Sequence, residues 1–126
     1  MKFNILILAL LCSFSLAACK NNDLSTNNFD KIEIHEMISF SEQKPNTLQV
    51  ISNQDDILTI TDAVNRAKKM AGIVDIADPH YQLQLGKYNY YLWINPNNTA
   101  TIMNVNDTNT IYRIYGAEKF INIIQQ

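Results

Sequence analysis

The segment from Tyr81 to Leu85 alternates its side chains without a break, reading Tyr-Gln-Leu-Gln-Leu. A period of two is the pattern of a β-strand that buries one face, and an α-helix cannot gather these residues on one side. Gly86-Lys87 follows and fits a two-residue hairpin turn with glycine at its first central position. The segment from Tyr88 to Ile94 is then the returning strand. The predicted cross-strand pairs are Leu85 with Tyr88, Leu83 with Tyr90, and Tyr81 with Leu92.

Other segments extend this hairpin in both directions. Alternation and turn-forming residues predict further strands over residues 29–38, 47–51, 99–105 and 110–115. Apolar side chains spaced three and four residues apart predict a helix over about 55–70, stopped by Gly72, and a short helix over 117–124. Because the strands are consecutive, with helices between and after them, the fold class is α+β. We expect an antiparallel sheet, made of an N-terminal hairpin and a four-strand meander, packed against one long helix and one short C-terminal helix.

The start of the chain has the composition of an export signal, with Lys2 followed by an apolar run from Ile5 to Leu16. The run is too short to span a bilayer as a stable helix. It ends in Leu16-Ala17-Ala18-Cys19, the pattern of a bacterial lipobox, in which a cysteine thiolate takes a diacylglyceryl group and the chain is cut before it. Leu16 misfits the general signal peptidase, which prefers a small residue at that position. We therefore predict lipidation of Cys19; the alternative is an ordinary thiol after a chance apolar start.

This prediction divides the chain into three parts: a lipoprotein signal peptide at 1–18, a lipidated cysteine with a flexible tether at 19–28, and a single domain at 29–126. Two acyl chains on Cys19 would hold the protein on the extracytoplasmic face of the cell membrane. The polar tether reaches roughly 30 Å at full extension. Cys12 leaves with the signal, so the mature chain keeps one cysteine and forms no internal disulfide.

Charge narrows the choice of partners. Loss of Lys2 leaves nine basic residues against twelve acidic ones, so the mature net charge is about −3. A nucleic-acid partner is therefore not expected. Lys68-Lys69 is only a pair at the end of a helical pattern, so no polybasic run is expected to bind anionic lipid.

The hairpin has a second face opposite its core face. Alternation places Gln84, Tyr91 and Trp93 on it. If each of the next two turns holds four residues, Ile102 lies opposite Tyr91 and Arg113 lies opposite Ile102. Aromatic residues and arginine are enriched in recognition surfaces. The candidate binding surface is Gln84, Tyr91, Trp93, Arg113 and Tyr115. The alternative is that other segments cover this face and make Tyr91 and Trp93 core residues.

The loop before Tyr81 carries Asp75, Asp78 and His80, which could bind a metal ion or supply an acid and a base. Asp78-Pro79 is also a common turn start, so a purely structural loop is the alternative. The chain has no nucleophile elbow and no glycine-rich phosphate loop. We therefore favour a domain without catalytic residues, metal or cofactor over an enzyme.

Four short segments can be compared with known families: Met70-Ala71-Gly72-Ile73-Val74-Asp75, Asp78-Pro79-His80-Tyr81, Tyr91-Leu92-Trp93-Ile94 and Asp107-Thr108-Asn109-Thr110-Ile111-Tyr112. They resemble the YhfM-like lipoproteins of bacilli, over roughly residues 50 to 124. Ala71 departs from the family pattern, which has proline before the glycine. The resemblance implies a lipoprotein on the outer face of the cytoplasmic membrane of a Gram-positive cell, and it carries no catalytic residues that could be transferred.

These features together predict a membrane-tethered, non-enzymatic domain that binds an envelope protein or a carbohydrate. The alternative is a small cell-envelope hydrolase or metal-dependent enzyme that uses the loop from Asp75 to His80.

Overall fold

The computed structural model describes residues 29–71 and 76–126. Within them the chain forms one antiparallel sheet of eight strands, with one longer helix and one shorter C-terminal helix, so the predicted α+β class is confirmed. The strands are β1 (Ile32–Ser39), β2 (Glu42–Gln43), β3 (Gln49–Ile51), β4 (Lys68–Lys69), β5 (Tyr81–Leu85), β6 (Tyr88–Asn95), β7 (Thr99–Asn104) and β8 (Ile111–Ile114). The helices are α1 (Gln54–Asn65) and α2 (Glu118–Ile124).

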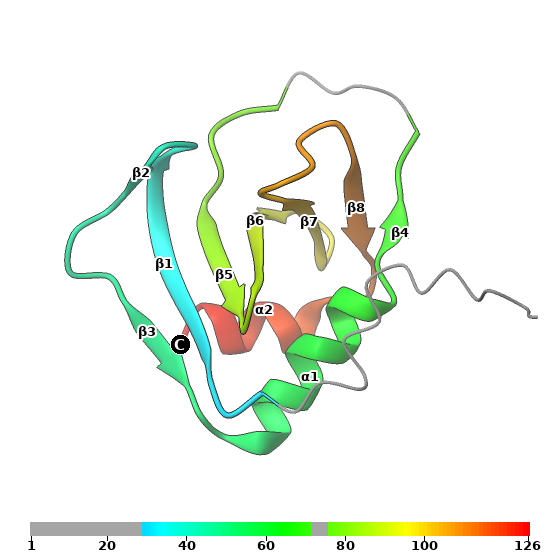
Figure 1. Ribbon diagram of the computed structural model, residues 1–126. Helices are drawn as coiled ribbons and strands as arrows, with labels where there is room; N and C mark the ends of the chain where they lie inside the picture. Colours follow the sequence, from blue (N-terminus) through cyan, green and yellow to red (C-terminus); the bar gives the residue numbers. More distant parts are fainter. Residues whose placement is uncertain (1–28, 72–75) are drawn as a thin grey trace, which may run out of the picture.

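The strands follow the order β2-β1-β5-β6-β7-β8-β4, and β3 also pairs with β1. The expected N-terminal hairpin is β1 with β3, and the expected meander is β5 to β8. β1 joins the two parts, because Ile34 lies opposite Gln49 on one edge and opposite Leu83 on the other. Figure 1 shows the strands as an arc from β1 to β4, with both helices at the bottom of the view.

The β5–β6 hairpin has the predicted register, from Leu85 opposite Tyr88 to Tyr81 opposite Leu92. Gly86 has a φ of 58°, a left-handed conformation that glycine adopts without the steric cost of a side chain. A Cβ atom at this position would lie 2.9 Å from a ring carbon of Phe29. Both the turn geometry and the close approach of Phe29 therefore favour glycine.

The β6–β7 turn differs from the four-residue turn expected. Three residues join the strands, and two of them, Asn97 and Asn98, have φ values of 61° and 54°. Asparagine tolerates this conformation better than most residues. The shorter turn shifts the register by one residue, so Met103 lies opposite Tyr91, where Ile102 was predicted. Such a slip exchanges the two faces of a strand, and Ile102 lies in the helix-covered core.

The β7–β8 connection shifts the register by one residue again. Arg113 lies opposite Thr101, where Ile102 was predicted, and Thr101 lies opposite Trp93. The two shifts add up to two residues, so Arg113 is aligned with Trp93 where Tyr91 was predicted, and an even shift leaves the sheet face unchanged. Arg113 is therefore on the same sheet face as Trp93, although the predicted neighbour between them was wrong.

Asn53 begins α1 by capping it. Its side-chain oxygen accepts hydrogen bonds from the backbone N–H groups of Asp55 and Asp56, at 3.0 and 3.1 Å. These bonds satisfy two of the four amides that a helix start leaves free. Ile57, Ile60 and Val64 of the predicted apolar stripe are buried.

α1 ends at Asn65, so the prediction of a helix to about residue 70 was wrong. Lys68 and Lys69 instead form β4 and pair with β8. The backbone N–H of Met70 continues this pairing and donates to the carbonyl of Ile111 at 2.9 Å. Pairing with β8 has thus overridden the helical periodicity of the segment. Gly72, the predicted helix stop, lies outside the described residues.

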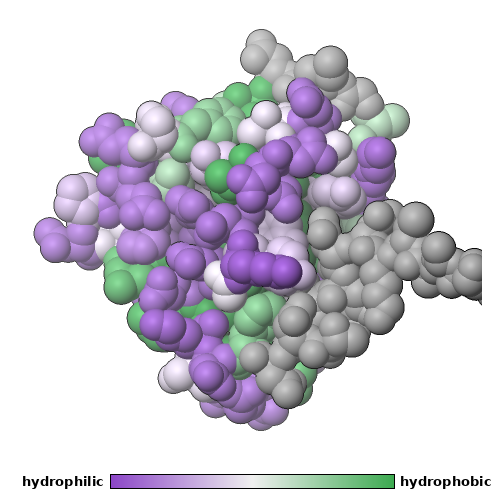
Figure 2. All heavy atoms as spheres, in the orientation of Figure 1, coloured by the Kyte–Doolittle hydropathy of each residue, from purple (hydrophilic) through white to green (hydrophobic). Residues whose placement is uncertain are grey.

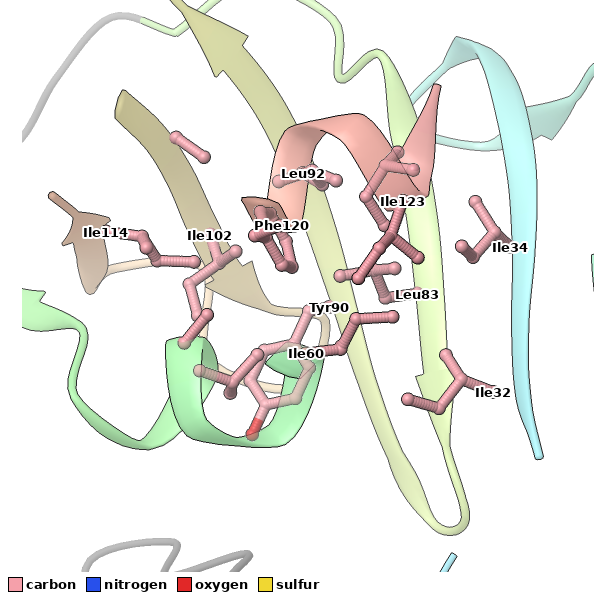
Figure 3. Close-up of a cluster of buried hydrophobic side chains, with 14 of the residues drawn as sticks. Ile32, Ile34, Ile60, Leu83, Tyr90, Leu92, Ile102, Ile114, Phe120 and Ile123 are labelled. Atoms are coloured by element: carbon pink, nitrogen blue, oxygen red, sulfur yellow. The ribbon is translucent and has the colours of Figure 1, made fainter. Parts of the chain in front are cut away.

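The helix-covered face of the sheet holds the main core. Leu83, Leu92 and Ile102 contribute from the strands and are at most 1% exposed. Figure 3 shows Phe120 of α2 and Ile60 of α1 pointing into the same space. Burial of one large apolar side chain is worth about 1.5–3 kcal/mol, so this core is the chief source of stability.

Candidate functional site

The opposite face of the sheet carries a second core. Its buried residues are Trp93, Met103 and Ile111, with Phe40, Met70, Ile76 and Tyr91 packed against them. Trp93 is only 5% exposed. Residues outside the helices cover this face, because Phe40 follows β1, Met70 follows β4 and Ile76 precedes β5.

Two aromatic residues of this core form hydrogen bonds with the segments that cover them. The hydroxyl of Tyr91 donates to the carbonyl of Phe40, and the ring N–H of Trp93 donates to the carbonyl of Ala77, both at 2.9 Å. The Phe40 ring stands edge-on to Tyr91, with centroids 5.2 Å apart. Buried aromatic donors need such partners. The structure therefore places Tyr91 and Trp93 in a core, the second of the two alternatives that alternation allowed.

The other three candidate surface residues are spread along the sheet. Gln84 of β5 is exposed, next to Glu33 of β1. Tyr115 is 48% exposed and directly follows β8. Arg113 is half-buried, and its Nε atom has no hydrogen-bond partner among the described residues. Because β6 and β7 separate Gln84 from Arg113 and Tyr115, the five candidates do not form one surface.

Asp78 and His80 line a hollow of about 670 Å³ beside β1. Glu36 and Lys44 line it too, and a salt bridge of 3.2 Å joins them. Gln125 also lines the hollow. The hollow thus presents carboxylate, ammonium, imidazole and amide groups, which together can hydrogen-bond hydroxyl and amide groups of a ligand.

His80 has a structural part in this hollow. Its Nδ1 atom accepts a hydrogen bond from the backbone N–H of Ile94 at 2.9 Å. Its own backbone N–H donates to the carbonyl of Leu92, and its carbonyl accepts from Met37, both at 3.0 Å. Since Nδ1 accepts, the remaining proton of the neutral ring is on Nε2. His80 therefore connects the segment before β5 to both β1 and β6.

The structure describes two of the three residues predicted to act as acid, base or metal ligand. Asp78 and His80 share the hollow, whereas Asp75 lies outside the described residues. Residues 29–71 and 76–126 contain no group of three histidine, cysteine or acidic side chains that could hold a metal ion.

The pairing of β4 with β8 creates a basic edge, made of Arg66, Lys68, Lys69 and Arg113. Lys68 lies directly opposite Arg113. Nη1 of Arg66 donates to the carbonyl of Tyr115 at 3.4 Å, and Nζ of Lys68 lies 6.0 Å from the centre of the Tyr115 ring. Four basic residues and one exposed tyrosine therefore lie along one edge of the sheet, with Lys69 on the face opposite to that of Lys68.

The basic edge is not neutralised within the described part of the chain. The salt bridges found there are Lys31 with Glu33 and Lys44 with Glu36, both at β1. The sequence alone did not predict the basic edge. Lys68-Lys69 has the pattern of a helix end, and Arg113 is more than 40 residues away in the chain. Only the strand pairing brings them together.

One face of the molecule has a mainly polar surface. Figure 2 shows the face seen in Figure 1 as predominantly hydrophilic, with hydrophobic residues in small separate groups. The exposed large apolar residues are Ile38, Leu48, Val50, Leu58 and Tyr115. A partner that binds this face would therefore meet mostly charged and amide groups.

The predicted lipidation site, Cys19, lies outside the described residues, as do the predicted signal and tether. Among the helices that the structure describes, none is long and apolar enough to cross a bilayer. Lipidation of Cys19 therefore stays a prediction from the sequence.

The molecule is thus a small α+β domain with two cores, a polar hollow and a basic edge, an arrangement that does not by itself specify an activity. A family model described as YhfM protein matches residues 29–126. The chain belongs to this family, and the match includes the N-terminal hairpin, which the resemblance seen in the sequence did not reach. No curated protein and no solved structure matches the chain.

Proposed function

We propose that this member of the YhfM family is a lipid-anchored extracytoplasmic protein whose domain binds an envelope protein or carbohydrate without catalysing a reaction. The observation that carries the anchor is Leu16-Ala17-Ala18-Cys19 at the end of an apolar run. A thiolate is the side chain nucleophilic enough near neutral pH to form a lipid thioether. Two acyl chains then anchor the protein stably, where one would bind only reversibly.

The hollow beside β1 is the site that we assign to the envelope partner. Glu36 and Asp78 offer acceptors, Lys44 offers donors, and His80 keeps the proton on Nε2 available while Nδ1 is occupied. Hydroxyl and amide groups of a sugar or peptide fit this mixture. An enzymatic role of Asp75, Asp78 and His80 gains less support, because Nδ1 of His80 is already committed to the Ile94 amide.

The anchor is tested by Cys19→Ala in cells fed a labelled fatty acid. We expect the variant to lose the lipid label and to accumulate at the size of the uncut precursor. Cys12→Ala is the matched control, because this cysteine lies in the signal and should be dispensable for labelling and cleavage. Label retained by Cys19→Ala would disprove the anchor.

The binding site is tested by placing a photo-crosslinking amino acid at Lys44, in the hollow, and separately at Lys87, in the β5–β6 turn. In intact cells, we expect a specific crosslinked envelope component from position 44 and none from position 87. Identical products from the two positions, or no product from position 44, would contradict this assignment.

A further inference from the structure

The basic edge places two like charges opposite each other. Lys68 of β4 and Arg113 of β8 are directly opposite in an antiparallel pair. Like charges in this position destabilise a sheet, and no carboxylate in the described part of the chain forms an ion pair with either. An anion at this edge would offset this repulsion.

Tyr115 adds a second kind of contact at the same edge. Arg66 holds its backbone carbonyl, Lys68 lies over its ring, and the residue is 48% exposed. Tyrosine has an apolar ring and a polar hydroxyl, so it suits the boundary between lipid headgroups and acyl chains. Cations beside an exposed tyrosine match the surface of an anionic membrane better than they match a free anion in solution.

We propose that the basic edge docks on a membrane surface with anionic phospholipid headgroups, whose phosphates bind between Lys68 and Arg113. The inference rests on the proposed anchor at Cys19. A tether that reaches roughly 30 Å would keep the edge close to the headgroups, and this high effective concentration would strengthen contacts that the free domain already makes. Because the mature chain is acidic as a whole, attraction is confined to this edge, and docking fixes one orientation of the domain.

The test uses the chain from residue 19 onward with Cys19→Ser, which contains both cores and cannot carry lipid. Its sedimentation is measured with vesicles of phosphatidylcholine alone and with vesicles that also contain phosphatidylglycerol. We expect binding to the anionic vesicles only, and weaker binding as salt increases. Combined Lys68→Gln and Lys69→Gln should reduce the partition coefficient about 25-fold, or about fivefold per residue.

The matched control carries Lys31→Gln and Lys87→Gln, which change the net charge equally but lie away from the basic edge. It should bind within about twofold of the parent, because charges beyond a Debye length of about 10 Å are screened. The melting temperature of the Lys68/Lys69 variant should be equal to or above that of the parent, since a repulsion has been removed. A melting temperature at or above that of the parent would show that lower binding is not caused by unfolding.

Equal binding to both vesicle types, or equal losses in the two double variants, would overturn the proposal. Binding to soluble polyphosphate but not to anionic vesicles would also overturn it and would assign the edge to a free polyanion. Because the tested chain carries no lipid, these outcomes are independent of the Cys19→Ala labelling experiment. A failed anchor and a failed docking surface are thus distinguishable.

Discussion

The two faces of the sheet bury their apolar side chains by different means. The main core lies beneath α1 and α2. The second core lies beneath irregular segments, and Tyr91 and Trp93 donate hydrogen bonds to the carbonyls of Phe40 and Ala77. A helix satisfies its own backbone groups, whereas an irregular segment brings unpaired carbonyls to the surface that it covers. A sheet face closed by such segments therefore needs side chains that are apolar and also donate hydrogen bonds.

The largest expected effect is in the main core. Phe120→Ala should lower the free energy of unfolding by about 3–5 kcal/mol, because it removes a fully buried ring and leaves a cavity. Urea unfolding followed by circular dichroism measures the change. Leu58→Ala is the control on the exposed side of α1 and should stay within about 0.5 kcal/mol of the parent. A loss below 1 kcal/mol for Phe120→Ala would show that the helices contribute little to stability.

The next effect depends on pH and concerns Tyr90, a residue of the main core. Burial, with smaller contributions from Tyr88 and Tyr112, raises the pKa of Tyr90 from 10.0 to about 12. The folded state therefore holds the phenol proton more tightly than the unfolded state. This contribution to stability is complete below about pH 10 and is lost as the pH rises to about 12.

The parent should lose unfolding free energy on the order of 2 kcal/mol between pH 10 and 12 because Tyr90 ionises. Tyr90→Phe should not show this loss. Unfolding free energies of parent and variant, measured across this range, give the difference directly. The two curves should coincide near pH 7. Parallel curves up to pH 12 would mean that Tyr90 ionises as easily in the folded state as in the unfolded one.

The smallest effect distinguishes the second core from the first. Tyr91→Phe removes the donor to the Phe40 carbonyl and should cost about 1–2 kcal/mol. Tyr90→Phe at neutral pH is the matched control in the main core, because no hydrogen bond of the Tyr90 hydroxyl occurs among the described residues, and it should cost less than about 0.5 kcal/mol. If the two variants lost equal unfolding free energy, the two faces would not differ in their need for hydrogen-bond donors.

Emission from Trp93 reports the second core alone, because it is the only tryptophan of the chain. In the parent protein it should be blue-shifted and protected from quenchers. Its urea transition should coincide with that of helical circular dichroism if the two cores unfold together. An earlier transition in Tyr91→Phe would show that the second core opens first.

Local patterns predicted those elements whose residues are neighbours in the chain. The hairpin from Tyr81 to Ile94 followed from alternation and one glycine turn, and its register was confirmed. The end of α1 did not follow, because residues 68–69 become a strand only when β8 lies beside them. The register beyond Asn95 failed for a local reason: two asparagines in left-handed conformations close a turn one residue shorter than expected.

The candidate site was less predictable because it depends on contacts between distant segments. Alternation placed Trp93 and Arg113 on the second face, but it could not show that Phe40 and the segment before β5 cover Trp93. The basic edge required the pairing of Lys68 with Arg113, which neither segment signals by itself.

The position of β1 has a mechanical consequence. It is the first strand after the residues that would carry the anchor, and it is hydrogen-bonded on both edges, to β2 and β3 on one side and to β5 on the other. Ladder bonds run perpendicular to an antiparallel strand. Tension that enters through the residues before Phe29 would therefore shear many of these bonds at once, whereas a strand pulled sideways would lose them one at a time. A domain pulled from this end is therefore suited to remain folded under load.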